Sequence, residues 1–502
     1  MPIPRLIAPT PEDCGVDSSR LELVFQRAEQ EVKSGRLQAC QVAVCRHGRL
    51  AGMRSFGVRP DGVAVADTDL FTIFSATKTS VGVVMWQLIE DGRIELSDSV
   101  AKYIPEFATY GKERVLILHL LNFTAGFPNP PPGKGSLASQ YSTSAARTAT
   151  FANWPLEWEP GSQWQYHPGS AHWVMAEIIE RLTGVDWRDY VRSRLLDPCG
   201  LSNYLLGPRP EHQNDYQFVD LCSRSAAGHF GPAAQSMWNT SEIRALGMPA
   251  GGGCTSAADL ALLYQPLLNG GQVYGGGQVL SPETIARATK QTTDSRHFAY
   301  LFAPPAENPD RVPTDTDIRV PKLRGWVVEL MGNDTLTLTF EDDATTSVVN
   351  GLDLNVAFGE GAEVPAGIFR QCRPGFNNAP GSIGHAGMHG QIGMLISALS
   401  RQAFSTVGAS WRHRRLSTRL MRAHLSPLLA GWGDPETGIS FAFVHNTEGG
   451  GGVELGLERQ LAMGTLANAA AILSKIGETK QRVERGLAML ASMQERLGSP
   501  KL

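Results

Sequence analysis

A serine and a lysine three positions apart, Ser75 and Lys78, stand in FSATKTS, where a polar turn runs into an apolar helix. A serine hydroxyl is a weak nucleophile at neutral pH and needs a base beside it. Because residues i and i+3 of a helix share a face, the Lys78 amine can lie next to the Ser75 hydroxyl. The positive end of the helix dipole disfavours a protonated lysine and favours an oxyanion. The spacing alone fits either a nucleophile or a solvated helix start, because S-x-x-K also arises by chance in chains of this length.

A tyrosine further along the chain adds a second candidate. Tyr166 lies in PGSQWQYHPGSAHWVMAEIIERLTG, where a Pro/Gly-rich turn directly precedes a helix. A buried phenol beside a lysine can act as a general base or a proton shuttle. A single tyrosine is also a common packing residue, so Tyr166 gains meaning only together with Ser75 and Lys78.

A glycine-dense, strand-like run, SIGHAGMHGQIG at 382–393, carries His385. Glycines let a ligand approach the backbone closely, and a strand edge there can supply an N–H group to an oxyanion hole. The alternative is a metal site formed by His385 and His389 at i, i+4. That arrangement requires a helix, which the glycines oppose, so no metal and no other cofactor is predicted.

Elements of two kinds must position these residues. Apolar residues at helical spacing, with capping and stop residues, predict helices, at 18–34, 75–91, 115–122, 170–183 and 256–268. Strand-like runs lie near both chain ends: a hairpin at 41–57, then RGWVVELMG, LTLTF, LNVAFG and ISFAFVHN. We expect an α+β fold of the α/β-sandwich type, in which both chain ends form one antiparallel sheet flanked by helices. A mostly helical lobe is inserted between them, with the active site in the groove.

Several ordered blocks resemble the serine β-lactamase-like superfamily, on the branch of class C β-lactamases, penicillin-binding-protein-like hydrolases and related carboxylesterases. The resemblance runs from about residue 15 to 446. It rests on DTDLFTIFSATKTSVGVVMWQLIEDGRIELSDSVAKYIPEF, ILHLLNFTAGFP, PGSQWQYHPGSAHWVMAEIIERLTG, MPAGGGCTSAADLALLYQPLLNGG, GHAGMHGQIG and DPETGISFAFVHN. Together these blocks are far more specific than the tetrapeptide alone, and they favour a functional Ser75 in a β-lactamase/transpeptidase-like fold.

The resemblance implies a role for each matching residue. Ser75 matches the acylated nucleophile, Lys78 the lysine that activates it, and Tyr166 the tyrosine of the Y-x-N element. The run His385, Ala386 and Gly387 occupies the place of the K-T-G strand, where esterase-like relatives often carry histidine. The backbone N–H groups of Ser75 and Met388 are then expected to form the oxyanion hole, with Ala386 and Gly387 beside the substrate.

The chain departs from the family pattern where the Y-x-N asparagine is expected. Pro168 occupies that position and has no side-chain amide, and His385 replaces the lysine of K-T-G. In β-lactamases the asparagine helps to hold the amide side chain of the substrate. These changes weaken the case for antibiotic or peptidoglycan substrates and are compatible with an esterase.

The bulk composition excludes several classes of partner. The chain has 502 residues, 42% hydrophobic and 19% charged, with a formal net charge of −4 and a pI near 6.3. These values give no electrostatic case for nucleic acid, and no apolar run approaches the roughly 20 residues that span a bilayer. The N-terminus has no sustained apolar signal region, and the seven scattered cysteines include no CxxC pair. We therefore expect reduced, mostly buried thiols in a cytoplasmic protein.

Two segments fit the expected domain poorly. Residues 396–430 contain six arginines and no acidic residue, which fits a basic partner-binding insertion, a plain surface insertion or a mistranslated segment. The helix-prone tail is interpreted as a docked terminal helix, because it lacks the sustained heptads of a coiled coil. The predicted organisation is a catalytic domain at 15–448, with 396–430 as an insertion, and a helical extension at 449–502.

The function predicted from the sequence is hydrolysis of carboxylic esters, and some amides, through an acyl-enzyme on Ser75. A small-molecule ester or amide is the expected partner. Two alternatives remain open. One is a β-lactamase or D-amino-acid peptidase of the same fold, and the other is a non-catalytic scaffold or filament-forming member.

Overall fold

The computed structural model describes residues 3–289, apart from Pro132, 226–227 and 234–235, and parts of the remaining chain. These parts are the backbone of 326–331, 335–342, 345–348, 383–385 and 431–433, then residues 437–448 and scattered positions between 463 and 491. The predicted strand LNVAFG and the arginine-rich segment 396–430 lie outside the described residues.

The main sheet is built from both ends of the chain, as predicted. Its five strands are antiparallel in the order β12-β13-β14-β1-β2. Their bounds are β1 (Ala39–Arg46), β2 (Arg49–Gly57), β12 (Ile383–His385), β13 (Gly431–Gly433) and β14 (Ile439–His445). The hairpin between β1 and β2 turns at His47 and Gly48, with φ of 50° and 77°. Positive φ at both positions matches the twist of a two-residue hairpin.

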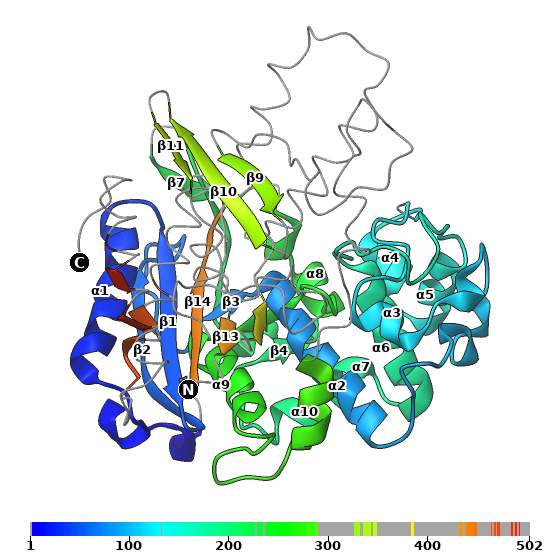
Figure 1. The fold of residues 1–502 in the computed structure, drawn as a ribbon, viewed down its shortest axis with the longest axis horizontal. Helices are drawn as coiled ribbons and strands as arrows, with labels where there is room; N and C mark the ends of the chain where they lie inside the picture. Colours follow the sequence, from blue (N-terminus) through cyan, green and yellow to red (C-terminus); the bar gives the residue numbers. More distant parts are fainter. Residues whose placement is uncertain are drawn as a thin grey trace, which may run out of the picture.

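Strand β1 is the centre of a sandwich between two helical layers. All eight of its residues are buried. Cys40, Val42 and Val44 pack in one apolar cluster with α1 (Ser18–Lys33), whereas Ala43 and Cys45 pack in the cluster that contains α9 (Ala257–Leu268). Alternate strand residues face opposite sides of a sheet, so each face of β1 has its own core. Figure 1 shows the sheet between α1 and α9.

The helices between β3 and β8 form the inserted lobe. They are α2 (Thr77–Glu90), α3 (Ile117–Leu121), α4 (Leu137–Tyr141), α5 (Ser144–Phe151), α6 (Ser170–Thr183), α7 (Trp187–Val191) and α8 (Ser241–Leu246). Helix α10 (Pro282–Thr289) follows α9. Short 3-10 and π turns connect these elements, among them η3 (Phe74–Ala76), η6 (Lys112–Arg114), η7 (Arg192–Leu196) and η9 (Met237–Asn239). In Figure 1 the group α3–α6 lies on the far side of α2 from the main sheet.

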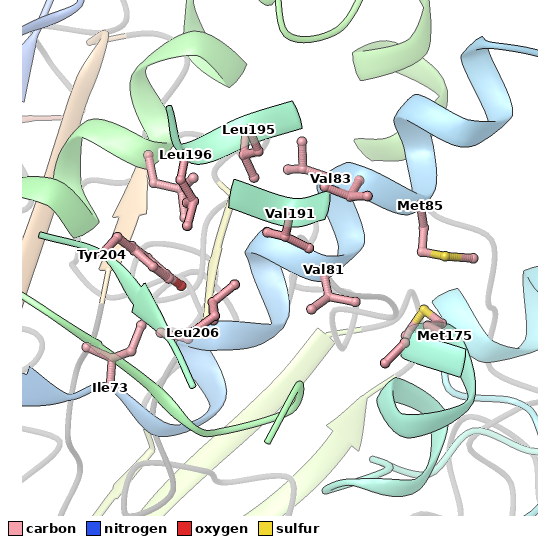
Figure 2. Packing of buried hydrophobic residues seen from close by; sticks show 14 of the residues in the cluster. Ile73, Val81, Val83, Met85, Met175, Val191, Leu195, Leu196, Tyr204 and Leu206 are labelled. Atoms are coloured by element: carbon pink, nitrogen blue, oxygen red, sulfur yellow. The ribbon is translucent and has the colours of Figure 1, made fainter. Parts of the chain in front are cut away.

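Helix α2 is buried on every side, whereas apolar residues at helical spacing are typical of a helix with one buried face. Its residues from Thr77 to Ile89 are all buried. Figure 2 shows Val81, Val83 and Met85 of α2 packed against side chains from η7 and from α6. A helix that is apolar all round belongs in a core, so α2 is a rigid support for the residues that precede it. The predicted helix end at 91 agrees with the structure, because α2 ends at Glu90 and Gly92 holds a φ of 68°.

The prediction of one sheet from all the late strands is wrong for two of them. Strands β9 (Trp326–Met331) and β10 (Thr335–Asp342) pair with β11 (Thr345–Val348) in a separate three-stranded sheet. Strands that are consecutive in the chain pair easily through short connections, and the amino-acid pattern does not say which sheet a strand joins. Two further small sheets were not predicted: β4-β8-β3-β5 and β15-β6-β7. Their strands are β3 (Leu70–Thr72), β4 (Leu205–Leu206), β5 (Phe218–Val219), β6 (Cys222–Arg224), β7 (Phe230–Pro232), β8 (Gly253–Thr255) and β15 (Thr447–Glu448).

The described positions of the C-terminal tail pack against the main sheet. Met463, Leu466 and Ala467 are helical and buried in the α1 cluster. The Asp17 backbone N–H, at the start of α1, donates to the Ala470 carbonyl at 2.8 Å. These contacts agree with a docked tail, and the predicted domain boundary at 448 stays a prediction. The six cysteines that the structure describes are buried and form no disulfide with one another, as expected.

Asp259, in the first turn of α9, is expected to lower the stability of the protein at neutral pH. Its Oδ2 accepts the Asn203 backbone N–H at 2.7 Å, and its Oδ1 has no hydrogen-bond partner among the described residues. Burial raises the pKa of this carboxyl from 3.8 to about 6, against the smaller opposing effect of the Asn203 N–H. Because the folded state holds the proton more tightly, the stability present below the unfolded pKa is lost as pH rises through about 6.

Asp259→Asn keeps an acceptor for Asn203 and removes the buried charge. We expect the free energy of unfolding at pH 7.5 to rise by about 2–3 kcal/mol, and by about half as much at pH 5. Urea unfolding of both proteins at the two pH values measures this difference. Equal midpoints at pH 7.5 would show that the carboxylate is not destabilising.

Candidate active site

Ser75 lies in η3, the turn that connects β3 to α2. The turn's own hydrogen bonds run from the Ala76 N–H to the Ile73 carbonyl and from the Thr77 N–H to the Phe74 carbonyl. The Ser75 N–H takes no part in them. Phe74 holds a φ of 45°, a left-handed conformation that is uncommon for a bulky residue. Such strained residues persist where the surrounding structure fixes them, and they cluster at functional sites.

Strand β8 holds this turn in place. The Ile73 N–H donates to the Gly253 carbonyl, and the Gly253 N–H donates to Thr77 Oγ1, both at 2.9 Å. Thr77 Oγ1 in turn donates to the Phe74 carbonyl. A Cβ atom at Gly253 would lie 2.8 Å from Thr77 Oγ1, so a glycine is required for this close approach. The turn that carries the nucleophile candidate is therefore fixed on both sides by hydrogen bonds to Gly253 of β8.

Lys78 is the second residue of α2, and its amine is fully buried beside Ser75. Its Nζ is 3.0 Å from Ser75 Oγ, 2.9 Å from the Pro168 carbonyl and 2.8 Å from the Ala250 carbonyl. These three partners are neutral oxygens. Burial holds the pKa of the Lys78 amine well below its usual value, because a charged ammonium loses its hydration there.

The geometry around Lys78 gives its neutral form a defined orientation. A carbonyl oxygen can only accept a hydrogen bond, so Pro168 and Ala250 each require an N–H from the amine. A neutral amine has two N–H groups and one lone pair. With both N–H groups taken by the carbonyls, the lone pair points toward Ser75 Oγ, where it can accept the hydroxyl proton.

Tyr166 completes the group from the turn before α6. Its hydroxyl donates to Ser75 Oγ at 2.8 Å, and its side chain is 4% exposed. The Lys78 Nζ lies 4.9 Å from the centre of the Tyr166 ring, and the edge of Phe123 packs on the same ring with centroids 5.3 Å apart. The structure thus brings the three predicted residues Ser75, Lys78 and Tyr166 into one hydrogen-bonded group.

The remaining predicted residues belong to β12 and the segment after it. His385 is the last residue of β12, pairs with Gly431, and lies in the edge strand of the described main sheet. Cα atoms of β12 lie within 8 Å of both η3 and α2, so this strand end is beside the Ser75 turn. Ala386, Gly387 and Met388 lie outside the described residues. The strand conformation at His385 opposes the helical i, i+4 metal arrangement considered from the sequence.

Two contributors to the site were not identified from the sequence, and both act through backbone carbonyls. Pro168 was noted only as a missing amide, yet its carbonyl binds Lys78. Ala250, in the MPAGGG segment, supplies the second carbonyl. A backbone carbonyl has no residue-type signature, so only the glycine-rich character of the second segment pointed to a close approach of the chain.

Among the residues that the structure describes, no group of three or more His, Cys, Asp or Glu side chains is placed to hold a metal ion. Within the same residues, no helix is both long enough and apolar enough to cross a bilayer.

Comparisons with known proteins indicate the family and the fold of this chain. The family model described as Beta-lactamase matches residues 24–462. A protein of Salmonella agona (strain SL483), provisionally named a D-alanyl-D-alanine carboxypeptidase, is 24% identical over 325 residues. The match covers 59% of this chain and 74% of the relative.

Three solved structures share the fold at low sequence identity. A penicillin-binding protein homolog from Caulobacter crescentus is 21% identical with a TM-score of 0.58, covering 91% of this chain and 99% of that one. EstCE1, a hydrolase with promiscuous acyltransferase activity, is 18% identical with a TM-score of 0.56, covering 90% and 99%. EstA from Arthrobacter nitroguajacolicus Rue61a is 19% identical with a TM-score of 0.55, covering 92% and 98%. The predicted α+β fold is confirmed by these likenesses.

Proposed function

This chain belongs to the beta-lactamase family, and from that premise we propose that it is a serine hydrolase that cleaves carboxylic esters through an acyl-enzyme on Ser75. One observation carries the proposal: Ser75 Oγ is hydrogen-bonded by both Lys78 Nζ and Tyr166 OH, at 3.0 and 2.8 Å. A serine held by a buried amine and a phenol has the base that nucleophilic attack requires.

The proposed reaction starts with neutral Lys78. Its lone pair accepts the Ser75 proton as Oγ attacks the ester carbonyl, and the Ser75 N–H stabilises the oxyanion. We assign the second oxyanion donor to the Met388 N–H, by the family position of that residue. The tetrahedral intermediate collapses when the C–O bond to the alcohol breaks, and the alkoxide takes a proton from Tyr166 OH, which Lys78 restores. Water then attacks the acyl-enzyme by the reverse route and releases the carboxylic acid and Ser75.

The preference for esters is inferred from what replaces the family's amide-binding group. Pro168 has no side-chain amide, and its carbonyl is already occupied by Lys78. An amide substrate therefore loses the asparagine donor that would hold its side chain, whereas a simple ester does not need that donor. His385 in place of the family's lysine supports the same preference. Two solved structures of the same fold are described as a hydrolase and as a family VIII carboxylesterase, which adds to it.

A D-amino-acid peptidase is the second candidate, favoured by the name of the Salmonella relative. The test is a comparison of kcat/KM for p-nitrophenyl butyrate, nitrocefin and a D-alanyl-p-nitroanilide. We expect the ester to exceed both amides by about a hundredfold or more, because the amide-specific donors are missing. Equal or faster cleavage of either amide would replace the esterase proposal with the peptidase or lactamase one. The absence of turnover with all three, combined with large assemblies on size-exclusion chromatography, would favour the scaffold alternative.

Tyr166→Phe is expected to lower kcat for the ester by about a hundredfold or more, because it removes the proton donor to the leaving group. The ring contacts with Phe123 remain, so KM and thermal stability should change little. Steady-state kinetics and a melting curve check both parts. Unchanged turnover would remove Tyr166 from proton transfer.

The pH dependence of kcat/KM should follow the neutral fraction of Lys78. Because burial lowers the pKa of this amine well below its usual value, the base is present above that lowered pKa and is lost as pH falls through it. Below that value kcat/KM should fall about tenfold per pH unit. A profile from about pH 5 to 10 measures this. A rate that keeps rising to pH 10, as an ordinary lysine requires, would contradict the assignment.

A further inference from the structure

We infer that His167 and Phe123 form a clamp that positions the Tyr166 hydroxyl on Ser75 Oγ. His167 and Phe123 are proposed as positioning residues that act through Tyr166 and do not touch the substrate. The inference rests on the proposed function, because the clamp matters only if Tyr166 takes part in the reaction.

His167 is fully buried, and both of its ring nitrogens have defined partners. Its Nδ1 lies 2.6 Å from the Gln165 carbonyl, and the Phe127 N–H donates to Nε2 at 3.4 Å. A carbonyl only accepts and an N–H only donates, so these contacts require the proton on Nδ1 and none on Nε2. The neutral ring is therefore the form that fits, and burial lowers the pKa of His167 to about 3, so it stays neutral near pH 7.

These two bonds fix the backbone on both sides of Tyr166. The Gln165 contact closes the turn across Tyr166, from the residue before it to the residue after it. The Phe127 contact ties that turn to a different loop. Phe127 is also held at its carbonyl, which accepts a hydrogen bond from Ser170 Oγ at 2.7 Å. The segment that carries the Tyr166 phenol is thus hydrogen-bonded to the loop at 123–127 through both His167 and Ser170.

Phe123 is the second half of the clamp. Its ring stacks on His167, with centroids 5.9 Å apart and planes 19° apart, and meets Tyr166 edge-on. Its carbonyl accepts the Gln165 N–H at 3.1 Å. Phe123 holds a φ of 61°, a strained conformation for a residue with a large side chain. The strain is tolerated where one residue must present both its ring and its carbonyl to the same turn.

The clamp has a clear physical purpose. A tyrosine at the end of a Pro/Gly-rich turn is otherwise free to shift, and a displacement of about 1 Å in a catalytic group can cost a hundredfold in rate. Ordering the turn before substrate arrives removes that loss. The proposal predicts that damage to the clamp lowers kcat only when the Tyr166 hydroxyl is present.

A double-mutant cycle tests this prediction. His167→Phe keeps the ring stacking and removes both hydrogen bonds, and it is made in wild type and in Tyr166→Phe. In wild type we expect kcat for p-nitrophenyl butyrate to fall about 10- to 100-fold, with KM within about threefold. In Tyr166→Phe the same change should cost less than about threefold. His167→Gln offers one donor and one acceptor and should recover most of the wild-type kcat.

The possible outcomes separate the clamp from a general structural role. Equal losses in both backgrounds, or no loss in wild type, would overturn the inference while leaving the proposed function intact. If Tyr166→Phe alone is fully active, both the clamp and the proposed role of Tyr166 fail. Phe123→Leu, which removes the ring contacts with His167 and Tyr166, gives a second cycle that is interpreted in the same way where His167→Phe does not fold. His172→Phe is the matched control: this buried histidine also lies against Phe123, with centroids 6.0 Å apart, but on α6, and its replacement should leave kcat within about threefold.

Discussion

Ser75→Ala should lower kcat/KM for an ester substrate by about 10⁴-fold or more, and it should abolish labelling by a fluorophosphonate probe. The alanine removes the only oxygen in the group that can form the acyl bond, while Lys78 and Tyr166 remain in place. Removing the nucleophile of such a unit costs about as much as removing the whole unit, because the other members have nothing to activate. Labelling is measured on the intact protein by gel or mass spectrometry, and turnover with p-nitrophenyl butyrate.

Ser80, about one and a half helical turns after Ser75, is the matched control for the Ser75→Ala variant. Ser80 is also buried, and its Oγ donates to the Thr77 carbonyl at 2.8 Å, not to the Lys78–Tyr166 group. Ser80→Ala should therefore keep both labelling and turnover near the wild-type level, at a small cost in stability. Equal labelling of Ser75→Ala and wild type would place the nucleophile elsewhere. Loss of labelling in both alanine variants would point to damaged folding of α2.

The side-chain members of this site were predictable because they have chemical identities. Ser75, Lys78 and Tyr166 are spaced in the chain as the family motifs require, and the structure joins them within 3.0 Å. The backbone groups that orient the Lys78 amine were not predictable from the sequence. Every residue type has a backbone carbonyl, so the sequence does not mark the carbonyls of Pro168 and Ala250. Their approach to Lys78 depends on how two distant turns pack.

His167 shows a different reason for a missed residue. As a lone histidine after Tyr166 it has no sequence pattern that distinguishes a buried structural ring from a functional one. Its significance comes from its contacts with Gln165 and Phe127, and the latter is 40 residues away in the chain. Tertiary contacts of this kind are set by packing, and local periodicity contains no information about them.

In the fold, too, some features were predictable from the sequence and others were not. Strand β1 and helix α1 follow from alternation and helical spacing, since each has a face buried in its own cluster. The pairing of β9 with β10 and β11 was missed because strand-forming residues indicate a strand but not its partner. The complete burial of α2 was also missed. In its amino-acid pattern, a helix that is covered on all sides resembles an amphipathic helix with extra apolar residues.

Lys78→Met should lower kcat/KM by about 10³-fold or more, because methionine fills a similar volume but cannot accept the Ser75 proton. The loss of activity depends on whether the buried Lys78 amine is neutral or charged. If Lys78 acted only by its positive charge, burial among three neutral oxygens would be an unfavourable position for it. With Lys78 neutral, the same surroundings orient its lone pair on Ser75 Oγ. The variant should retain slow fluorophosphonate labelling at high pH, where hydroxide replaces the missing base.

The chain offers a second buried lysine as the control for Lys78→Met. Lys112 is equally inaccessible, and its Nζ also lies within hydrogen-bond distance of three neutral oxygens, which belong to Thr109 and Trp154. Burial lowers the pKa of Lys112 to about 8 as well, so the two amines share the property of being easily deprotonated. Only Lys78 has a serine hydroxyl in front of its lone pair. Lys112→Met should therefore lower the melting temperature but keep kcat/KM within about threefold. Equal loss of activity in both variants would mean that burying an amine in this lobe maintains the fold, and that Lys78 is not the base.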